Sequence, residues 1–225
     1  MFKFIKIFFF IISPLGIFAF GLQIYHSLSS ASFISTEYTM TVYGFFAGSI
    51  LWLVLGRFLQ FFHVLEHELT HLLFGILFLR KPKAISASDQ GGRTELYGGN
   101  FIITLAPYFF PTLSFLLLVF FPLLDERFYN YFFITLGCFT GYHFISNIQE
   151  FKFSQPDIQE AGIIFSPIFC LFGSIVTLGF ILGFLDDGFK GGGDFFVEGF
   201  NQSTNIIVYL YEQARVLTGK LRWLL

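Results

Sequence analysis

The chain is poor in charged residues, which make up 12% of its 225 positions, about half the share in an ordinary soluble domain. Two cysteines and a formal net charge of −2 provide neither a disulfide framework nor a basic face for a nucleic acid. Apolar residues are abundant instead, at 55%, and 37 of them are phenylalanines. This composition excludes a disordered chain, a secreted disulfide scaffold and a nucleic-acid binder, and it predicts a membrane protein with several crossings.

Five apolar stretches are long enough to cross a membrane. A spanning helix needs about 20 mostly apolar residues, because the hydrocarbon core is about 30 Å thick. We therefore expect an all-α polytopic membrane protein with about five transmembrane helices. The five stretches are residues 7–25, 38–79, 101–124, 128–149 and 161–185. The second is long for one crossing, but no turn signal beyond Gly56 divides it, so we expect one continuous helix.

Lysine and arginine are unevenly distributed between the expected loops. Loops on the cytoplasmic side carry an excess of these residues, and alternate loops here do so. Taking that side as the inside places the N-terminus inside. The basic residues expected inside are Lys3, Lys6, Arg80, Lys81, Lys83, Arg93 and Lys152, and those expected outside are Arg127 and Lys190.

The C-terminal part of the chain differs from the spans. Residues 186–199 are rich in glycine and are expected to form an outer loop. The apolar residues that follow fall on one helical stripe, away from the charged ones, which predicts an amphipathic helix lying at the membrane surface. The stripe consists of Ile206, Leu210, Leu217, Leu221 and Leu224.

One motif in the second stretch contains candidate metal-binding and catalytic residues. Residues 67–71 read His-Glu-Leu-Thr-His, and residues four apart share one face of a helix. His67 and His71 can therefore bind one zinc ion, while Glu68 is placed to take a proton from a water activated by the metal. Because ionisable residues within a membrane are costly and functional by default, a metal site is favoured over a chance match.

A catalytic zinc site needs a third protein ligand and an open coordination position. The charge pattern brings residues 150–160 to the same side of the membrane as His71. Within this loop Asp157 is the preferred third ligand, although an aspartate there also suits a helix N-cap. The competing third ligands are Glu150, Glu160 and His143.

Three further polar residues are candidates for supporting the metal or for replacing a ligand. They are His63, His143 and Asn147. His63 lies one helical turn before His67, and we favour a hydrogen bond from His63 to a neighbouring helix over ligation.

The polar segment after the second stretch has the pattern of a short hairpin. Residues 84–88 and 93–97 flank the turn sequence Asp-Gln-Gly-Gly. The edge of such a hairpin can hold an extended peptide by strand addition. An ordinary polar loop explains the sequence equally well.

Residues 60–165, roughly, resemble the site-2 protease family of intramembrane zinc metallopeptidases. The resemblance rests on the 67–71 motif with its distant aspartate, and on similarity to bacterial members around Gly91-Gly92, Gly98-Gly99-Asn100, Leu105-Ala106-Pro107-Tyr108 and Gln155-Pro156-Asp157 with Gly162. It implies that His67, His71 and Asp157 bind Zn2+ and that Glu68 is the general base. It further implies substrate positioning by Gly91, Gly92 and Asn100, and peptide-bond hydrolysis near the cytoplasmic face. Many members have glycine after the aspartate, where this chain has Ile158.

The resulting hypothesis is an intramembrane zinc metalloendopeptidase that acts on membrane-anchored proteins or peptides. We expect a transmembrane metallopeptidase-like domain over residues 1–200, an amphipathic tail over residues 201–225, and a multi-pass location in a bacterial inner membrane. The lipid bilayer is an expected partner and nucleic acid is not. The alternatives are a membrane metal-binding transporter, for which few polar residues are available to line a path, and a catalytically inactive metallopeptidase-like scaffold.

Overall fold

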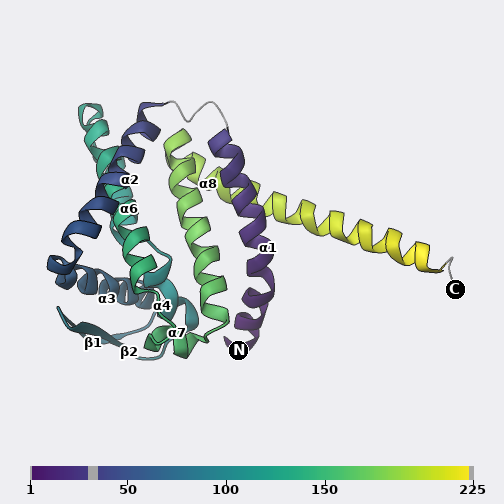
Figure 1. The fold of residues 1–225 in the computed structure, drawn as a ribbon, viewed down its shortest axis with the longest axis horizontal. Coiled ribbons are helices and arrows are strands. Elements are labelled where there is room, and N and C mark those ends of the chain that lie inside the picture. Colours follow the sequence, from purple (N-terminus) through teal and green to yellow (C-terminus); the bar gives the residue numbers. More distant parts are fainter. Residues whose placement is uncertain (1, 30–34, 223–225) are drawn as a thin grey trace.

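The computed structural model describes residues 2–29 and 35–222 of the chain. It is mostly helical, as expected, and contains one two-stranded sheet in the part of the chain that is described. The long helices stand side by side, while α3 (Gln60–Leu77), α4 (Phe101–Leu105), α7 (Pro156–Ala161) and the sheet gather at one end of the bundle, near the N-terminus (Figure 1). The long helices are α1 (Phe2–Ser29), α2 (Thr36–Leu55), α6 (Tyr129–Glu150) and α8 (Phe165–Arg222).

Three helices within the described residues are long and apolar enough to cross a membrane: Phe4–Ser29, Thr36–Phe58 and Phe165–Val216. A bent pair, Phe101–Tyr108 with Thr112–Leu123, would make a fourth crossing. Helix α6 is not among these candidates, and its C-terminal half carries several polar side chains. A membrane protein is therefore supported, but five crossings are not confirmed.

The prediction of one continuous helix over residues 38–79 is wrong. Helix α2 ends at Leu55, a 3-10 turn η2 (Gly56–Phe58) follows, and a separate helix α3 (Gln60–Leu77) begins. Side-chain contacts hold this bend, because the Trp52 indole donates to Gln149 on α6 over 2.9 Å and packs against the His63 ring at 5.0 Å. As a result α3 crosses the lower end of the bundle at a steep angle to α2 (Figure 1).

The third apolar stretch is also interrupted. It forms α4 (Phe101–Leu105), η3 (Ala106–Tyr108), α5 (Thr112–Phe120) and η4 (Phe121–Leu123), and a bend of 86° separates its two halves. Pro107 and Pro111 lie in this region, and proline removes a helical hydrogen bond and blocks the preceding turn. A further 3-10 turn, η5 (Glu126–Phe128), leads into α6.

Glycines bring α2 and α6 into backbone contact. A β-carbon added to Gly44 would lie 2.0 Å from the Ile134 carbonyl oxygen, and one added to Gly141 would lie 2.0 Å from the Phe45 carbonyl oxygen. Such close packing of small residues is typical of helix pairs in membranes. It fixes α6 against α2 and so brings the C-terminal end of α6 beside α3.

The predicted outer loop over residues 186–199 is wrong, because these residues are largely helical. Only Asp187 and Gly188 depart from helical geometry, and the chain reverses there. Beyond the reversal, a β-carbon on Gly191 would lie 2.1 Å from the Gly183 carbonyl oxygen. The glycines thus allow close packing of the two parts of α8 instead of forming a flexible loop.

The C-terminal tail is helical to Arg222 and extends away from the bundle (Figure 1). No helix break lies between residues 200 and 201. Of the predicted stripe, Ile206 is half-buried and packs against the cluster of Phe20 and Phe195, while Leu210 is exposed. Leu224 lies outside the described residues, as do the side chains of Leu217 and Leu221, so the surface location of the stripe stays a prediction.

The predicted hairpin is confirmed. Strand β1 (Pro82–Ser88) pairs antiparallel with β2 (Gly91–Leu96), with Ser88 opposite Gly91 and Ala87 opposite Gly92. Gly91 has φ +138°, a conformation that residues with a β-carbon rarely adopt. Both strands pack along α3, which places β2 beside the motif of residues 67–71.

Candidate metal centre

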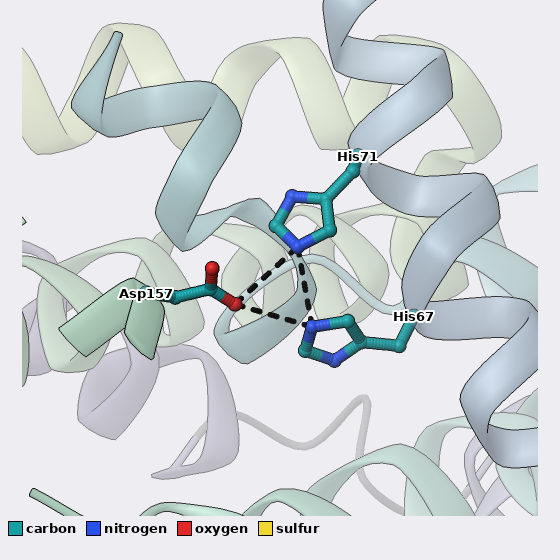
Figure 2. A group of neighbouring side chains, drawn as sticks. All are labelled: His67, His71 and Asp157. Atoms are coloured by element: carbon teal, nitrogen blue, oxygen red, sulfur yellow. Dashed lines mark hydrogen bonds and ion pairs between the residues drawn. The ribbon is translucent and has the colours of Figure 1, made fainter. Parts of the chain in front are cut away.

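Three side-chain atoms from two separate helices converge on one point (Figure 2). The Nε2 atoms of His67 and His71 are 3.2 Å apart. The Asp157 Oδ2 atom lies 3.3 Å from the first and 3.4 Å from the second. Among the described residues, these three form the only group of three or more His, Cys, Asp and Glu side chains with metal-ligand spacing.

Helix α3 presents both histidines to the same neighbours. His67 and His71 are one helical turn apart, and their rings meet edge-on with centroids 4.9 Å apart. Because the chain bends at η2, α3 lies across the bundle end, so this face contacts α4 and approaches α7 (Pro156–Ala161). The bend that the sequence did not predict is therefore what brings the motif to Asp157.

A backbone carbonyl group fixes the orientation of the His71 ring. Its Nδ1 atom lies 2.9 Å from the Ile103 carbonyl oxygen, which can only accept a hydrogen bond. His71 Nδ1 therefore carries a proton, and in this orientation Nε2 is the ring nitrogen that faces the group of three and can bind a metal. Ile103 is held in turn by Asn100, whose side-chain oxygen accepts from the Ile103 backbone N–H over 3.0 Å and caps α4.

Asn100 therefore does not lie where the substrate-positioning role implied by the resemblance would place it. Its side chain is engaged in the cap, it is buried, and it does not line the cleft in front of the site. This placement does not fit a contact with substrate. Asn100 supports the site indirectly, because it fixes the start of α4 and with it the carbonyl of Ile103.

Asp157 lies in the first turn of α7, but the N-cap position belongs to Gln155. The alternative interpretation of Asp157 as a helix cap is therefore wrong. The fully buried Ile158 anchors α7 in a cluster of apolar side chains that includes Phe101 and Leu105. This packing aims the Asp157 carboxylate at the two histidines.

Tyr108 is a residue to which the sequence assigned no individual role. Its hydroxyl donates to Asp157 Oδ2 over 3.2 Å, and its ring packs edge-on against His67 with centroids 5.3 Å apart. It orients both groups at once. A single tyrosine in an apolar stretch has no spacing that would have revealed this contact, and only the resemblance drew attention to the segment.

The spacing of the three atoms suits a zinc ion. Ligands at about 2.0–2.1 Å around a tetrahedral zinc lie about 3.3–3.4 Å from one another, and the three separations here are 3.2, 3.3 and 3.4 Å. Two imidazoles and one carboxylate are also an established donor set for catalytic zinc.

A cleft of about 880 Å³ lies in front of the three residues. Glu68, Gly91 and Gly92 line it, together with the exposed Glu160 on α7. The Glu68 side chain is only 6% exposed, and a β-carbon on Gly92 would lie 2.7 Å from its Oε1 atom. The hairpin therefore closes directly over the carboxylate that the sequence assigns as base.

The remaining candidate ligands lie apart from the three. His63 Nδ1 is 2.9 Å from the Tyr142 hydroxyl, and His63 Nε2 is 3.2 Å from Glu150 Oε2, so His63 is bonded to α6. Glu150 also accepts from Gln60 over 3.1 Å. His143 and Asn147 bond to each other over 2.9 Å.

The outer face of the hairpin carries a small network of charges. Lys83 Nζ lies 2.8 Å from Glu95 Oε2, and Arg93 Nε lies 3.2 Å from Glu95 Oε1. The Lys83 ammonium, followed by Arg93, holds the pKa of Glu95 below its ordinary value. Because these groups are exposed, the pairs align the strands and add little stability.

Comparison with known proteins gives no relative for this arrangement. The chain matches no protein-family model, no curated protein and no solved structure.

Proposed function

We propose that this chain is an intramembrane zinc metalloendopeptidase. In this proposal His67, His71 and Asp157 bind the zinc ion and Glu68 is the general base. The observation that carries it is the tetrahedral spacing of the three ligand atoms, 3.2–3.4 Å, at the wall of a cleft that also contains the Glu68 side chain.

Zinc, when bound, supplies a Lewis acid that polarises a peptide carbonyl and lowers the pKa of water. The chain's own residues provide the rest. Glu68 lies next to a ligand in sequence and reaches the same cleft, so its carboxylate is placed to take the proton of the attacking water and pass it to the leaving amine. Thr94 Oγ1 donates to the Glu68 backbone carbonyl over 3.0 Å and holds that residue against the hairpin.

The hairpin supplies a place for an extended substrate. Within the described residues β2 pairs with β1 alone, and residues of β2 line the cleft. A peptide that adds along the free edge of β2 would have its backbone held by main-chain hydrogen bonds. This suits proteolysis, because the peptide bonds of a membrane helix are protected by their own hydrogen bonds until the helix is opened.

Membrane location is part of the proposal. The three apolar helices support a multi-pass protein, and the site lies at the end of the bundle where the chain begins (Figure 1). Lys6 on α1 lies over the Phe165 ring at 5.2 Å, just after α7. With the N-terminus inside, the site would face the cytoplasmic surface of a bacterial inner membrane, and substrates would be membrane-anchored proteins.

Substitution of the base tests the enzymatic part of the proposal. Purified Glu68→Gln protein in detergent should bind as much zinc as wild type, and it should cleave a membrane-anchored test peptide at least 100-fold more slowly, the lower range for loss of a general base. Glu160→Gln, which changes another carboxylate of the same cleft, is the matched control and should keep its activity. Equal cleavage by wild type and Glu68→Gln would refute Glu68 as the base. Zinc movement into sealed vesicles by wild type, without cleavage, would favour a transporter instead.

A further inference from the structure

A second, much smaller cavity lies behind the metal centre. Its volume is about 10 Å³, which is close to the space that one buried water molecule needs. Most of the residues that line it are polar and come from α3 and α6, and Pro107 and Phe110 complete the wall. The polar residues that line it are His63, Glu66, His67, Thr70, His143 and Asn147. A cavity of this size and polarity suits one water and little else.

His67 lines both this cavity and the cleft. Its Nε2 atom faces His71 and Asp157, and Figure 2 shows its second ring nitrogen on the other side of the ring. A histidine that binds a metal almost always donates its second N–H to a carboxylate, a carbonyl or a water. His71 has such a partner in Ile103, whereas no protein group within the described residues bonds directly to His67 Nδ1.

Glu66 offers a fixed acceptor at the cavity wall. Its carboxylate interacts with the Tyr142 hydroxyl and with the Leu113 backbone N–H, and that hydroxyl lies 2.9 Å from His63 Nδ1. The Trp52 ring packs against the rings of His63 and Tyr142, with centroids 5.0 and 5.2 Å away. A carboxylate has about four acceptor positions, so the contacts with Tyr142 and Leu113 leave Glu66 able to accept from a water.

Asn147 offers the second acceptor. Its amide nitrogen is 2.9 Å from His143 Nε2, and His143 is only 6% exposed. With its amide nitrogen engaged, Asn147 retains the amide oxygen for a further bond. The Thr70 hydroxyl, by contrast, already bonds to the Glu66 carbonyl and to Thr112, over 2.8 and 2.5 Å.

We propose that the small cavity is a binding site for one water molecule, which accepts the Nδ1–H of His67 and donates to the Glu66 carboxylate and the Asn147 amide oxygen. Glu66 and Asn147 are then positioning residues for His67. They act through this water to keep Nε2 directed at the metal and to raise its basicity. The inference rests on the zinc site of the proposed function and not on peptidase activity.

Zinc affinity of the full chain in detergent, measured by competition with a chelator, tests this site. Glu66→Ala and Asn147→Leu should each lower the affinity about 10–100-fold, the usual effect of losing such a partner. Glu66→Gln keeps an oxygen acceptor at the same place and should bind within a few-fold of wild type. Thr140→Val is the matched control. Thr140 lies on α6 like Asn147, and the substitution removes its buried hydrogen bond to Ser114 on α5 without touching the cavity.

Proton NMR of the cobalt-substituted protein gives a second readout, the signals of the exchangeable ring protons of the ligand histidines. A general loss of stability would not change the signal of one histidine and spare the other. Wild type should show slowly exchanging Nδ1–H signals for both ligand histidines in proton NMR, and Asn147→Leu should change the His67 signal while leaving that of His71 in place. In the affinity measurement, equal zinc binding by Glu66→Ala, Asn147→Leu and Thr140→Val would refute the water site and leave the metal centre standing. Wild-type protein that binds no zinc would overturn the metal centre and this inference together.

Discussion

Gly92 on β2 lies in direct contact with the side chain of Glu68 on α3. A β-carbon at position 92 would come within 2.5 Å of Glu68 Cγ and 2.7 Å of Oε1. The hairpin and the proposed base are thus fitted to each other, and the smallest residue is the one that allows it. The same glycine lines the cleft, so it lies both against Glu68 and beside the proposed place for substrate.

Gly92→Ala should displace Glu68 or lift the hairpin, and either shift misplaces the base. We expect peptide cleavage to fall about 10–100-fold, because a displacement of about 1 Å at a catalytic group has effects of this size. Zinc content should not change, since none of the three ligands touches Gly92. Gly99→Ala serves as the control, because a β-carbon there meets nothing within 4 Å in the same cleft wall. Equal activity of the two variants would contradict the account of Glu68.

Substitution of Gly48 tests the packing of α2 on α6. A β-carbon there would lie 2.0 Å from the Cys138 carbonyl oxygen, so the two backbones must separate. Gly48→Ala should destabilise the protein by about 1–3 kcal/mol, the usual cost of overpacking, and lower the Tm in detergent. Gly21→Ala, where nothing lies within 4 Å of the added carbon, should leave the Tm unchanged or raise it slightly. A Tm for Gly48→Ala equal to that of Gly21→Ala would show that the helices are not in backbone contact.

Tyr108→Phe removes the hydroxyl that bonds to Asp157 Oδ2 and keeps the ring that packs against His67. Zinc affinity should fall about 10-fold, the lower range for the loss of a group that orients a ligand. Tyr43→Phe on α2, where the side chain is exposed, should bind zinc like wild type. Chelator competition on both variants decides this, and an unchanged affinity for Tyr108→Phe would mean that the hydroxyl does not orient Asp157.

The sequence predicted which side chains lie together better than it predicted the path of the chain. The four-residue spacing places His67 and His71 on one face of any helix. The charge pattern brought Asp157 to the same side together with Glu150 and Glu160, and the preference for Asp157 came mainly from the family resemblance. The hairpin was also predicted, since its glycine turn is a local signal.

The bends were not predictable, because tertiary contacts decide them. Gly56 fits a helix as well as a break, and only the contacts of Trp52 with His63 and Gln149 select the break. The glycines of residues 186–199 suggest a loop in isolation, yet Gly191 packs against Gly183 within α8. Tyr108 in η3 contacts Asp157 in α7, and no residue spacing in the sequence predicts a contact between these two segments.

Zinc content of the purified chain tests the central claim most directly. Wild type, His67→Ala, Asp157→Ala and Glu160→Ala are purified in detergent with zinc present, and the bound metal is measured after removal of free ions. Wild type and Glu160→Ala should retain one zinc per chain, while His67→Ala and Asp157→Ala should lose most of it, because each removes one of three protein ligands. A wild-type chain without zinc, or an Asp157→Ala chain that retains it, would contradict the proposed metal centre.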